Sequence, residues 1–247
     1  MVRPASNARS IPCWQSPRFA RESGRSLFPT EHRRFKRGAV SIGAPFRRVE
    51  TSHNGCSENF LGDGRIFWGD GNLDGVPVDA KGRALYSERF IHAEVFRVRA
   101  DVNAVVHAHA PSVIPFADTN VPMRPMNHMG SFMGDGVPVF DIRKNFGITD
   151  MLVSDSKKGH ALAEVLGNKN VVLMRGHGVA VVGPTVRHVV GRSIYLEVNA
   201  RTQAQALSFG SPITYLDPQE AKKMLDSGEN GGYERPWAAW KAKAMGR

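Results

Sequence analysis

The chain has 247 residues, of which 41% are hydrophobic and 23% charged, and its formal net charge is +10. This hydrophobic share excludes a wholly disordered chain, and two cysteines are too few for a disulfide scaffold or a cysteine-built zinc site. No apolar run approaches the roughly 20 residues that span a bilayer. We therefore expect a cytoplasmic protein of a reducing compartment, with no membrane partner.

The positive charge is concentrated in residues 1–60, which hold 11 Lys and Arg against 4 Asp and Glu, a net +7, whereas residues 61–247 carry +3. The N-terminal segment is rich in Ser, Pro, Gly and Arg and shows no sustained apolar periodicity, so we predict a poorly ordered basic segment over 1–60. A nucleic-acid-binding tail and an organelle transit peptide are the alternatives. Because the excess charge is local, we expect no nucleic-acid partner for the remainder.

Residues 61–247 are predicted to form one domain in which strands and helices interleave, which indicates an α/β class. Strands are predicted over 60–66, 72–78, 102–109, 170–174 and 179–182. Helices are predicted over 88–97, 112–117, 155–166, 186–207, 218–225 and 236–245. Ser87 and Ser154 are candidate N-caps, and Gly167 is a candidate C-terminal stop.

His107 and His109 lie at positions i and i+2 of a predicted apolar strand, so their side chains share one face. Two imidazoles on one face are suited to bind a divalent cation, although two histidines with ordinary structural contacts would show the same spacing. His177 projects from a Gly-His-Gly turn between two valine-rich segments and could add a third imidazole. Glu88, in the first turn of a predicted helix, is a fourth candidate because the helix dipole favours its ionised form.

The chain resembles the class II aldolase/adducin family over about residues 72–216. The segments that carry this resemblance are Tyr86-Ser87-Glu88, Asp101–Pro111, Arg175–Val179 and Tyr195-Leu196-Glu197. Glu88 lies nineteen residues before His107, as in that family. The resemblance implies a three-layer αβα sandwich around a mostly antiparallel sheet, usually assembled as a homotetramer. It also implies His107, His109 and His177 as ligands of one divalent ion, Zn²⁺ or Mn²⁺, and Glu88 as the acid-base group.

Three further segments are similar to the decarboxylase branch of the family. They are Met126–Gly130, Val139–Arg143 and Val172–Gly178. The expected function is a metal-dependent carbon–carbon lyase, most simply a decarboxylase of a hydroxylated aromatic or ring-cleavage dicarboxylic acid. Candidate substrate-binding residues for such a small carboxylate are His128, Arg143, Arg175 and Tyr195. Each of the four could instead be a structural polar residue, and Tyr195 could act at the site of a neighbouring subunit.

Two alternatives keep the family but change the function: an aldolase or epimerase of a sugar phosphate, and a non-catalytic scaffold like adducin. Tyr86-Ser87 stands where phosphate-binding members carry a serine pair, which argues against a phosphorylated substrate. The helices and glycine-containing strand with which family members begin have no recognisable counterpart in residues 1–60. That segment has therefore diverged, or it is translated from a different reading frame.

Overall fold

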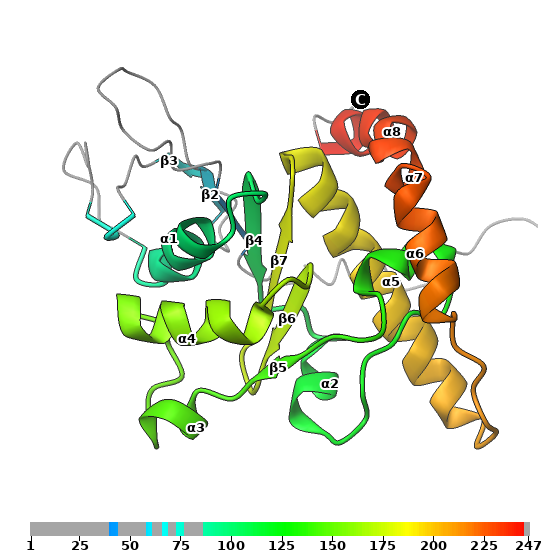
Figure 1. Ribbon diagram of the computed structural model, residues 1–247, viewed down its shortest axis with the longest axis horizontal. Coiled ribbons are helices and arrows are strands. Elements are labelled where there is room, and N and C mark those ends of the chain that lie inside the picture. The colour runs from blue at the N-terminus through cyan, green and yellow to red at the C-terminus, as the bar shows by residue number, and fades with distance from the viewer. Residues whose placement is uncertain (1–39, 44–57, 61–65, 69–72, 77–85, 245–247) are drawn as a thin grey trace, which may run out of the picture. The chain divides into compact units, whose positions relative to one another are not determined.

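The computed structural model describes residues 40–43, 58–60, 66–68, 73–76 and 86–244 (Figure 1). The strands are β1 (Val40–Gly43), β2 (Glu58–Phe60), β3 (Ile66–Trp68), β4 (Ala104–Ala108), β5 (Val139–Phe140), β6 (Val171–Met174) and β7 (Gly178–Gly183). The helices are α1 (Arg89–Val98), α2 (Ile114–Asp118), the 3-10 helix η1 (His128–Met133), α3 (Arg143–Phe146), α4 (Ser156–Leu166), α5 (Val186–Ser208), α6 (Pro218–Asp226), α7 (Glu229–Gly232) and α8 (Glu234–Ala244).

These strands form one sheet in the order β3-β2-β1-β4-β7-β6-β5. All neighbouring pairs are antiparallel except β5 and β6, which run parallel. The sheet is therefore mostly antiparallel, as the family resemblance implied. Within the described ranges, no helix combines the length and apolar character that a membrane span requires.

Two hydrophobic cores lie on opposite faces of the sheet because alternate residues of each strand point in opposite directions. On β4, Val105 belongs to a core that includes Ile91 of α1 and residues of α4. The next residue, Val106, belongs to a second core with Leu196 of α5. Figure 1 shows α1 and α4 together on one side of the sheet and α5 on the other. The predicted three-layer αβα arrangement is thus confirmed.

Two predicted helix caps are wrong by one residue. Asp155, rather than Ser154, caps α4, and its carboxylate accepts a hydrogen bond from the Lys158 amide at 2.9 Å. The N-cap position of α1 belongs to Glu88 rather than Ser87, and its side chain makes no capping bond. The Glu88 carboxylate points instead toward His107 and His177.

The N-terminal half of the sheet differs from the sequence prediction. Strands β1 and β2 lie within residues 1–60, so the sheet begins before residue 61. The register of β1 places Ser41 opposite His107, so this strand supports the one that carries the two histidines. The predicted strand over 72–78 is a turn at 73–76, where Gly75 has a φ of +70°. The rest of the predicted poorly ordered segment, 1–39 and 44–57, lies outside the described residues.

Candidate metal centre

His107 and His109 project from the end of β4 toward the layer of α1 and α4. They share their face with Val105, whose side chain lies in the core formed with those helices. His107 is 1% exposed, and its Nε2 lies 3.1 Å from Nε2 of His109. The i, i+2 spacing on a strand therefore brings the two imidazoles together as the sequence predicted.

His177 lies in the turn between β6 and β7, and its imidazole contacts that of His109. The turn is tight because Gly176 adopts a φ of +63° and the His177 amide donates to the Met174 carbonyl at 3.1 Å. Gly178 has to be glycine because a Cβ atom there would clash with the backbone carbonyl of Ala108. The result is that Nε2 of His177 lies 2.9 Å from Nε2 of His109.

Glu88 completes the cluster from the start of α1. Its Oε2 lies 3.3 Å from Nε2 of His107, and its Oε1 lies 3.3 Å from Nε2 of His177. The Tyr86 hydroxyl donates to Oε2 at 3.0 Å, and the Val153 amide donates to Oε1 at 3.2 Å. Glu88 is 3% exposed. The ligand atoms of Glu88 and the three histidines all lie within 4.8 Å of one another.

The ring nitrogens are arranged as a divalent cation requires. Nδ1 of His107 contacts the Val179 carbonyl at 3.1 Å, and Nδ1 of His177 contacts the Met151 carbonyl at 3.1 Å. A carbonyl oxygen only accepts, so each Nδ1 carries the proton and each Nε2 presents a lone pair to the cluster. Ligands of a tetrahedral zinc ion lie about 3.3 Å apart, close to the separations seen here. The donor set thus fits a Zn²⁺-like ion with an open position.

Electrostatics keep Glu88 ionised and His109 neutral in the cluster. Burial opposes ionisation of Glu88, but the neighbouring His107 and His177 outweigh it and hold the Glu88 pKa well below its ordinary value. Burial, together with the neighbouring imidazoles, lowers the pKa of His109 to about 4. An ionised carboxylate beside a neutral imidazole such as that of His109 suits a metal ion.

Two groups around the cluster also have shifted pKa values. Burial lowers the pKa of His92, which lies on α1 one turn after Glu88, to about 3. Burial and the charge of Glu88 raise the pKa of the Tyr86 phenol, so this hydroxyl keeps its proton and donates a hydrogen bond to the carboxylate. A neutral His92 and a neutral Tyr86 therefore surround the charged Glu88.

The two predicted arginines lie at the edge of the sheet where β5 and β6 end, and both bind Asp141. Nη2 of Arg143 contacts Oδ2 of Asp141 at 2.7 Å, and Nε of Arg175 contacts Oδ1 at 2.9 Å. The two guanidinium groups hold the Asp141 pKa well below its usual range. Arg175 lies two residues before His177 and its side chain is 25% exposed, whereas that of Arg143 is 53% exposed. Asp141 offsets one of the two positive charges.

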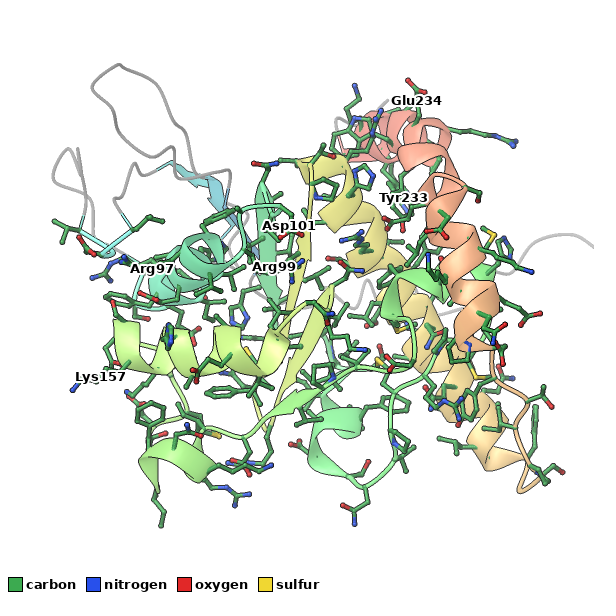
Figure 2. The ribbon with its side chains drawn as sticks, viewed as in Figure 1. Arg97, Arg99, Asp101, Lys157, Tyr233 and Glu234 are labelled. Carbon is green, nitrogen blue, oxygen red and sulfur yellow. The ribbon has the colours of Figure 1, made fainter. Side chains whose placement is uncertain are left out.

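The structure does not bring His128 or Tyr195 to the histidine cluster. His128 is exposed at the start of η1, whose buried residues lie in the core of the α5 face. Tyr195 packs against that same core and stacks on Tyr233 at a ring-centroid distance of 6.0 Å. Figure 2 labels Tyr233 beside α5. Because His107 faces the other side of the sheet, a substrate role for Tyr195 would require a second subunit.

Sequence reasoning missed three contacts that hold the cluster in place. The sequence places Tyr86 in a family motif without a role, whereas its hydroxyl contacts Glu88. The Met151 carbonyl and the Val153 amide contact His177 and Glu88 through backbone atoms. Backbone contacts leave no residue-type signal, so only the position of Tyr86, two residues before Glu88, could have been recognised.

The chain is similar to several known proteins. The family model for the class II aldolase and adducin N-terminal domain matches residues 64–204. Decarboxylase tropJ of Talaromyces stipitatus is 37% identical over 187 residues, which cover 68% of this chain and 70% of tropJ. A 3,4-dihydroxyphthalate decarboxylase of Arthrobacter keyseri is 27% identical over 175 residues, covering 68% of this chain and 64% of that protein. The matches thus span about two thirds of these relatives.

A solved structure shows the same fold. The aldolase II superfamily protein from Pseudomonas syringae superposes with a TM-score of 0.61 and 21% identity, covering 84% of this chain and 83% of that one. The family match spans more than half of the chain and contains all four residues of the cluster, Glu88, His107, His109 and His177. The chain belongs to the class II aldolase and adducin family.

Proposed function

We propose that this protein is a divalent-metal-dependent decarboxylase of a hydroxylated aromatic or ring-cleavage dicarboxylic acid. The observation that carries the proposal is the convergence of three imidazole Nε2 atoms and one carboxylate, all within 4.8 Å, at the end of β4. Similarity to two proteins named as decarboxylases supports this reaction over others that the family could host.

In this proposal the three imidazoles hold one divalent ion. When bound, such an ion acts as a Lewis acid, which stabilises negative charge on a substrate oxygen by several kcal/mol. Zn²⁺ suits a set of three imidazoles with an open position, and Mn²⁺ is the alternative. His107 and His177 are held in the required orientation by the hydrogen bonds from their Nδ1 atoms to backbone carbonyls.

Glu88 moves the proton. Its low pKa means that it begins as a carboxylate. Its position beside the imidazoles lets it accept the proton of the substrate hydroxyl, whose acidity a bound ion would raise. When the carbon–carbon bond to the leaving carboxylate breaks, CO₂ departs and the electron pair stays on the substrate. Glu88 then returns the proton to the carbon that lost CO₂, which restores the carboxylate. The Tyr86 hydroxyl and the Val153 amide hold both oxygens of Glu88 during this exchange.

Arg175 is the better candidate of the two arginines for the second carboxylate of the substrate. It lies two residues before His177, and the single Asp141 carboxylate is shared between it and Arg143. Its partial exposure leaves the guanidinium accessible to a small anion. Arg143 is the second candidate, because Asp141 already holds it through both Nε and Nη2, whereas Asp141 holds Arg175 through Nε alone. His128 lies on the α5 face, as Tyr195 does, so it also enters the proposal only from a neighbouring subunit. Tyr195 enters it only as a residue of a neighbouring subunit in a homotetramer, with the assembly placed in the cytoplasm.

The test is a CO₂-release assay with Zn²⁺- or Mn²⁺-loaded protein. The substrates are 3,4-dihydroxyphthalate and a carboxylated hydroxymuconic semialdehyde, with L-fuculose 1-phosphate as the aldolase control. We expect CO₂ from an aromatic or ring-cleavage acid and no dihydroxyacetone phosphate from the sugar phosphate. Glu88→Gln should abolish turnover without releasing metal. Cleavage of the sugar phosphate without CO₂ release from either acid would replace the decarboxylase by an aldolase.

A further inference from the structure

The loop between α3 and α4 reaches the cluster through two backbone atoms. The Met151 carbonyl accepts a hydrogen bond from Nδ1 of His177 at 3.1 Å. Two residues later the Val153 amide donates to Oε1 of Glu88 at 3.2 Å. A single short segment therefore contacts both a candidate metal ligand and the candidate acid-base group.

Met151 has a backbone conformation that is uncommon for its residue type. Its φ is +65°, in the left-handed region that glycine adopts readily and other residues avoid. Two side chains hold the turn around it: Oγ1 of Thr149 accepts from the Met151 amide at 2.9 Å, and Oδ1 of Asp150 accepts from the Leu152 amide at 3.1 Å. Val153, which is fully buried, anchors the end of the turn.

The Met151 side chain has a separate contact that has to be distinguished from the backbone one. Its sulfur lies against Gly176, where a Cβ atom would be 3.2 Å away. The thioether thus packs on the turn that carries His177. A packing role through the side chain and a positioning role through the carbonyl predict different results for substitutions at this position.

We propose that the turn formed by Thr149–Val153 is a positioning element for the metal centre. In this role the strained backbone of Met151 aims its carbonyl at Nδ1 of His177, while Val153 holds the Glu88 carboxylate at the other end. Groups that orient a metal ligand through its second nitrogen typically change metal affinity or activity about 10- to 100-fold when they are altered. The inference rests on the proposed metal site but not on decarboxylation.

The first test compares Met151→Val with Met151→Gly in the full chain by titration with Co²⁺. Both substitutions remove the thioether, but only glycine adopts a positive φ without strain, whereas a β-branched residue does not. We expect Met151→Val to bind Co²⁺ about tenfold or more weakly than Met151→Gly, with an altered visible spectrum of the bound ion. Equal losses in both variants would assign Met151 a packing role and overturn the proposal.

The second test avoids a residue that contacts the histidines. Thr149→Ala removes the acceptor for the Met151 amide, and Thr149→Ser restores it. We expect the alanine variant to lose about tenfold in Co²⁺ affinity and the serine variant to recover it, at matched thermal stability. This pair decides the question if Met151→Val does not fold. Equal affinities for alanine and the parent chain would also overturn the proposal.

The parent chain separates this inference from the proposed function. If the parent binds Co²⁺ but releases no CO₂ from any acid, the decarboxylase proposal fails and the variant comparison still decides the role of the turn. If the parent does not bind Co²⁺, both the metal site and the positioning role are refuted.

Discussion

Two clusters of buried charge lie on opposite sides of the sheet, and they are built in different ways. On the α1 face, Glu88 and three histidines converge with electron pairs directed at one another. On the α5 face, the Arg192 guanidinium pairs with the Glu229 carboxylate through two hydrogen bonds of 2.6 and 2.5 Å. The first cluster gathers groups that can all act as metal ligands, whereas the second joins a cation and an anion.

The Arg192 cluster is satisfied by its own residues. Nη1 of Arg192 donates to Oδ1 of Asn170 at 3.0 Å and to the Val182 carbonyl. The Tyr233 hydroxyl donates to Oε1 of Glu229 at 2.9 Å. This network ties α7 and the start of α8 to α5 (Figure 2). It needs nothing from outside the chain, so its role is structural.

The histidine cluster instead gathers groups that are all ligands of metal ions, with their ligand atoms within 4.8 Å of one another. Imidazole and carboxylate groups that offer lone pairs to a common point repel one another unless a cation or protons lie between them. Burial of charge alone therefore does not mark a functional site. A functional site is indicated where buried groups converge without complementing one another.

The largest expected effect is loss of the metal site. His107→Ala should weaken metal binding strongly and reduce turnover by about 10³-fold or more, because it removes one of the three protein ligands that a catalytic zinc site keeps. His160→Ala, at a half-exposed histidine on α4, is the matched control and should leave both unchanged. Metal analysis and turnover are the measurements. Full activity in the His107 variant would refute the metal role.

Substitutions in the Arg192 cluster should lower the free energy of unfolding rather than the activity. Arg192→Met leaves the Glu229 carboxylate buried without its cation, and such losses cost about 3–5 kcal/mol of unfolding free energy. The double variant Arg192→Met/Glu229→Leu removes both charges and should recover most of this loss. Urea unfolding of the single and double variants measures the difference. Metal affinity of the folded fraction should stay the same in both, and a large drop in affinity would contradict the distinction between the clusters.

A smaller stability effect is expected where α5 contacts Tyr233. A Cβ atom on Gly191 would lie 2.6 Å from the Tyr233 ring, so Gly191→Ala forces the ring to move. Overpacking of this kind costs about 1–3 kcal/mol. In a double-mutant cycle with Tyr233→Ala, the added cost of Gly191→Ala should disappear. If the cost persists without the ring, the contact does not limit residue size at position 191.

A pH-dependent effect is expected on the acid stability of the metal-free protein. The pKa of His109 is about 4 in the fold and near 6.5 in an unfolded chain, so the unfolded state binds a proton first as the pH falls. Its contribution to stability is therefore present above pH 6.5 and is lost between about pH 6.5 and 4. His109→Asn should flatten this part of the unfolding curve of chelator-treated protein. An unchanged slope would show that His109 is protonated alike in both states.

The sequence predicted the parts of the molecule that have a chemical signature. His107 and His109 follow from strand alternation, and the layers follow from the α/β order and the resemblance. The cap at Asp155 was misplaced because Ser154 is an equally good cap by residue type. The two-residue strand β5 was missed because so short a segment has no periodicity. The Met151 and Val153 contacts depend on backbone direction, which residue type does not reveal.

The sequence also did not predict on which side of the sheet a residue lies. Tyr195 and His177 are both in family motifs, yet His177 reaches the cluster and Tyr195 packs on Tyr233 and Trp240. The difference depends on which side of the sheet α5 covers. Leu196 and Ala200 of α5 pack into the core on the face opposite His107, and the periodicity of this long helix does not specify that side.

The most direct test of the central claim is a crystal structure of Co²⁺- or Zn²⁺-soaked protein with anomalous diffraction at the metal edge. We expect one strong peak per chain, bonded to the Nε2 atoms of His107, His109 and His177 at about 2.0–2.1 Å. No peak is expected at the Arg192 cluster. A peak elsewhere, or histidines that stay unbound at saturating metal, would contradict the assignment of this cluster as a metal centre.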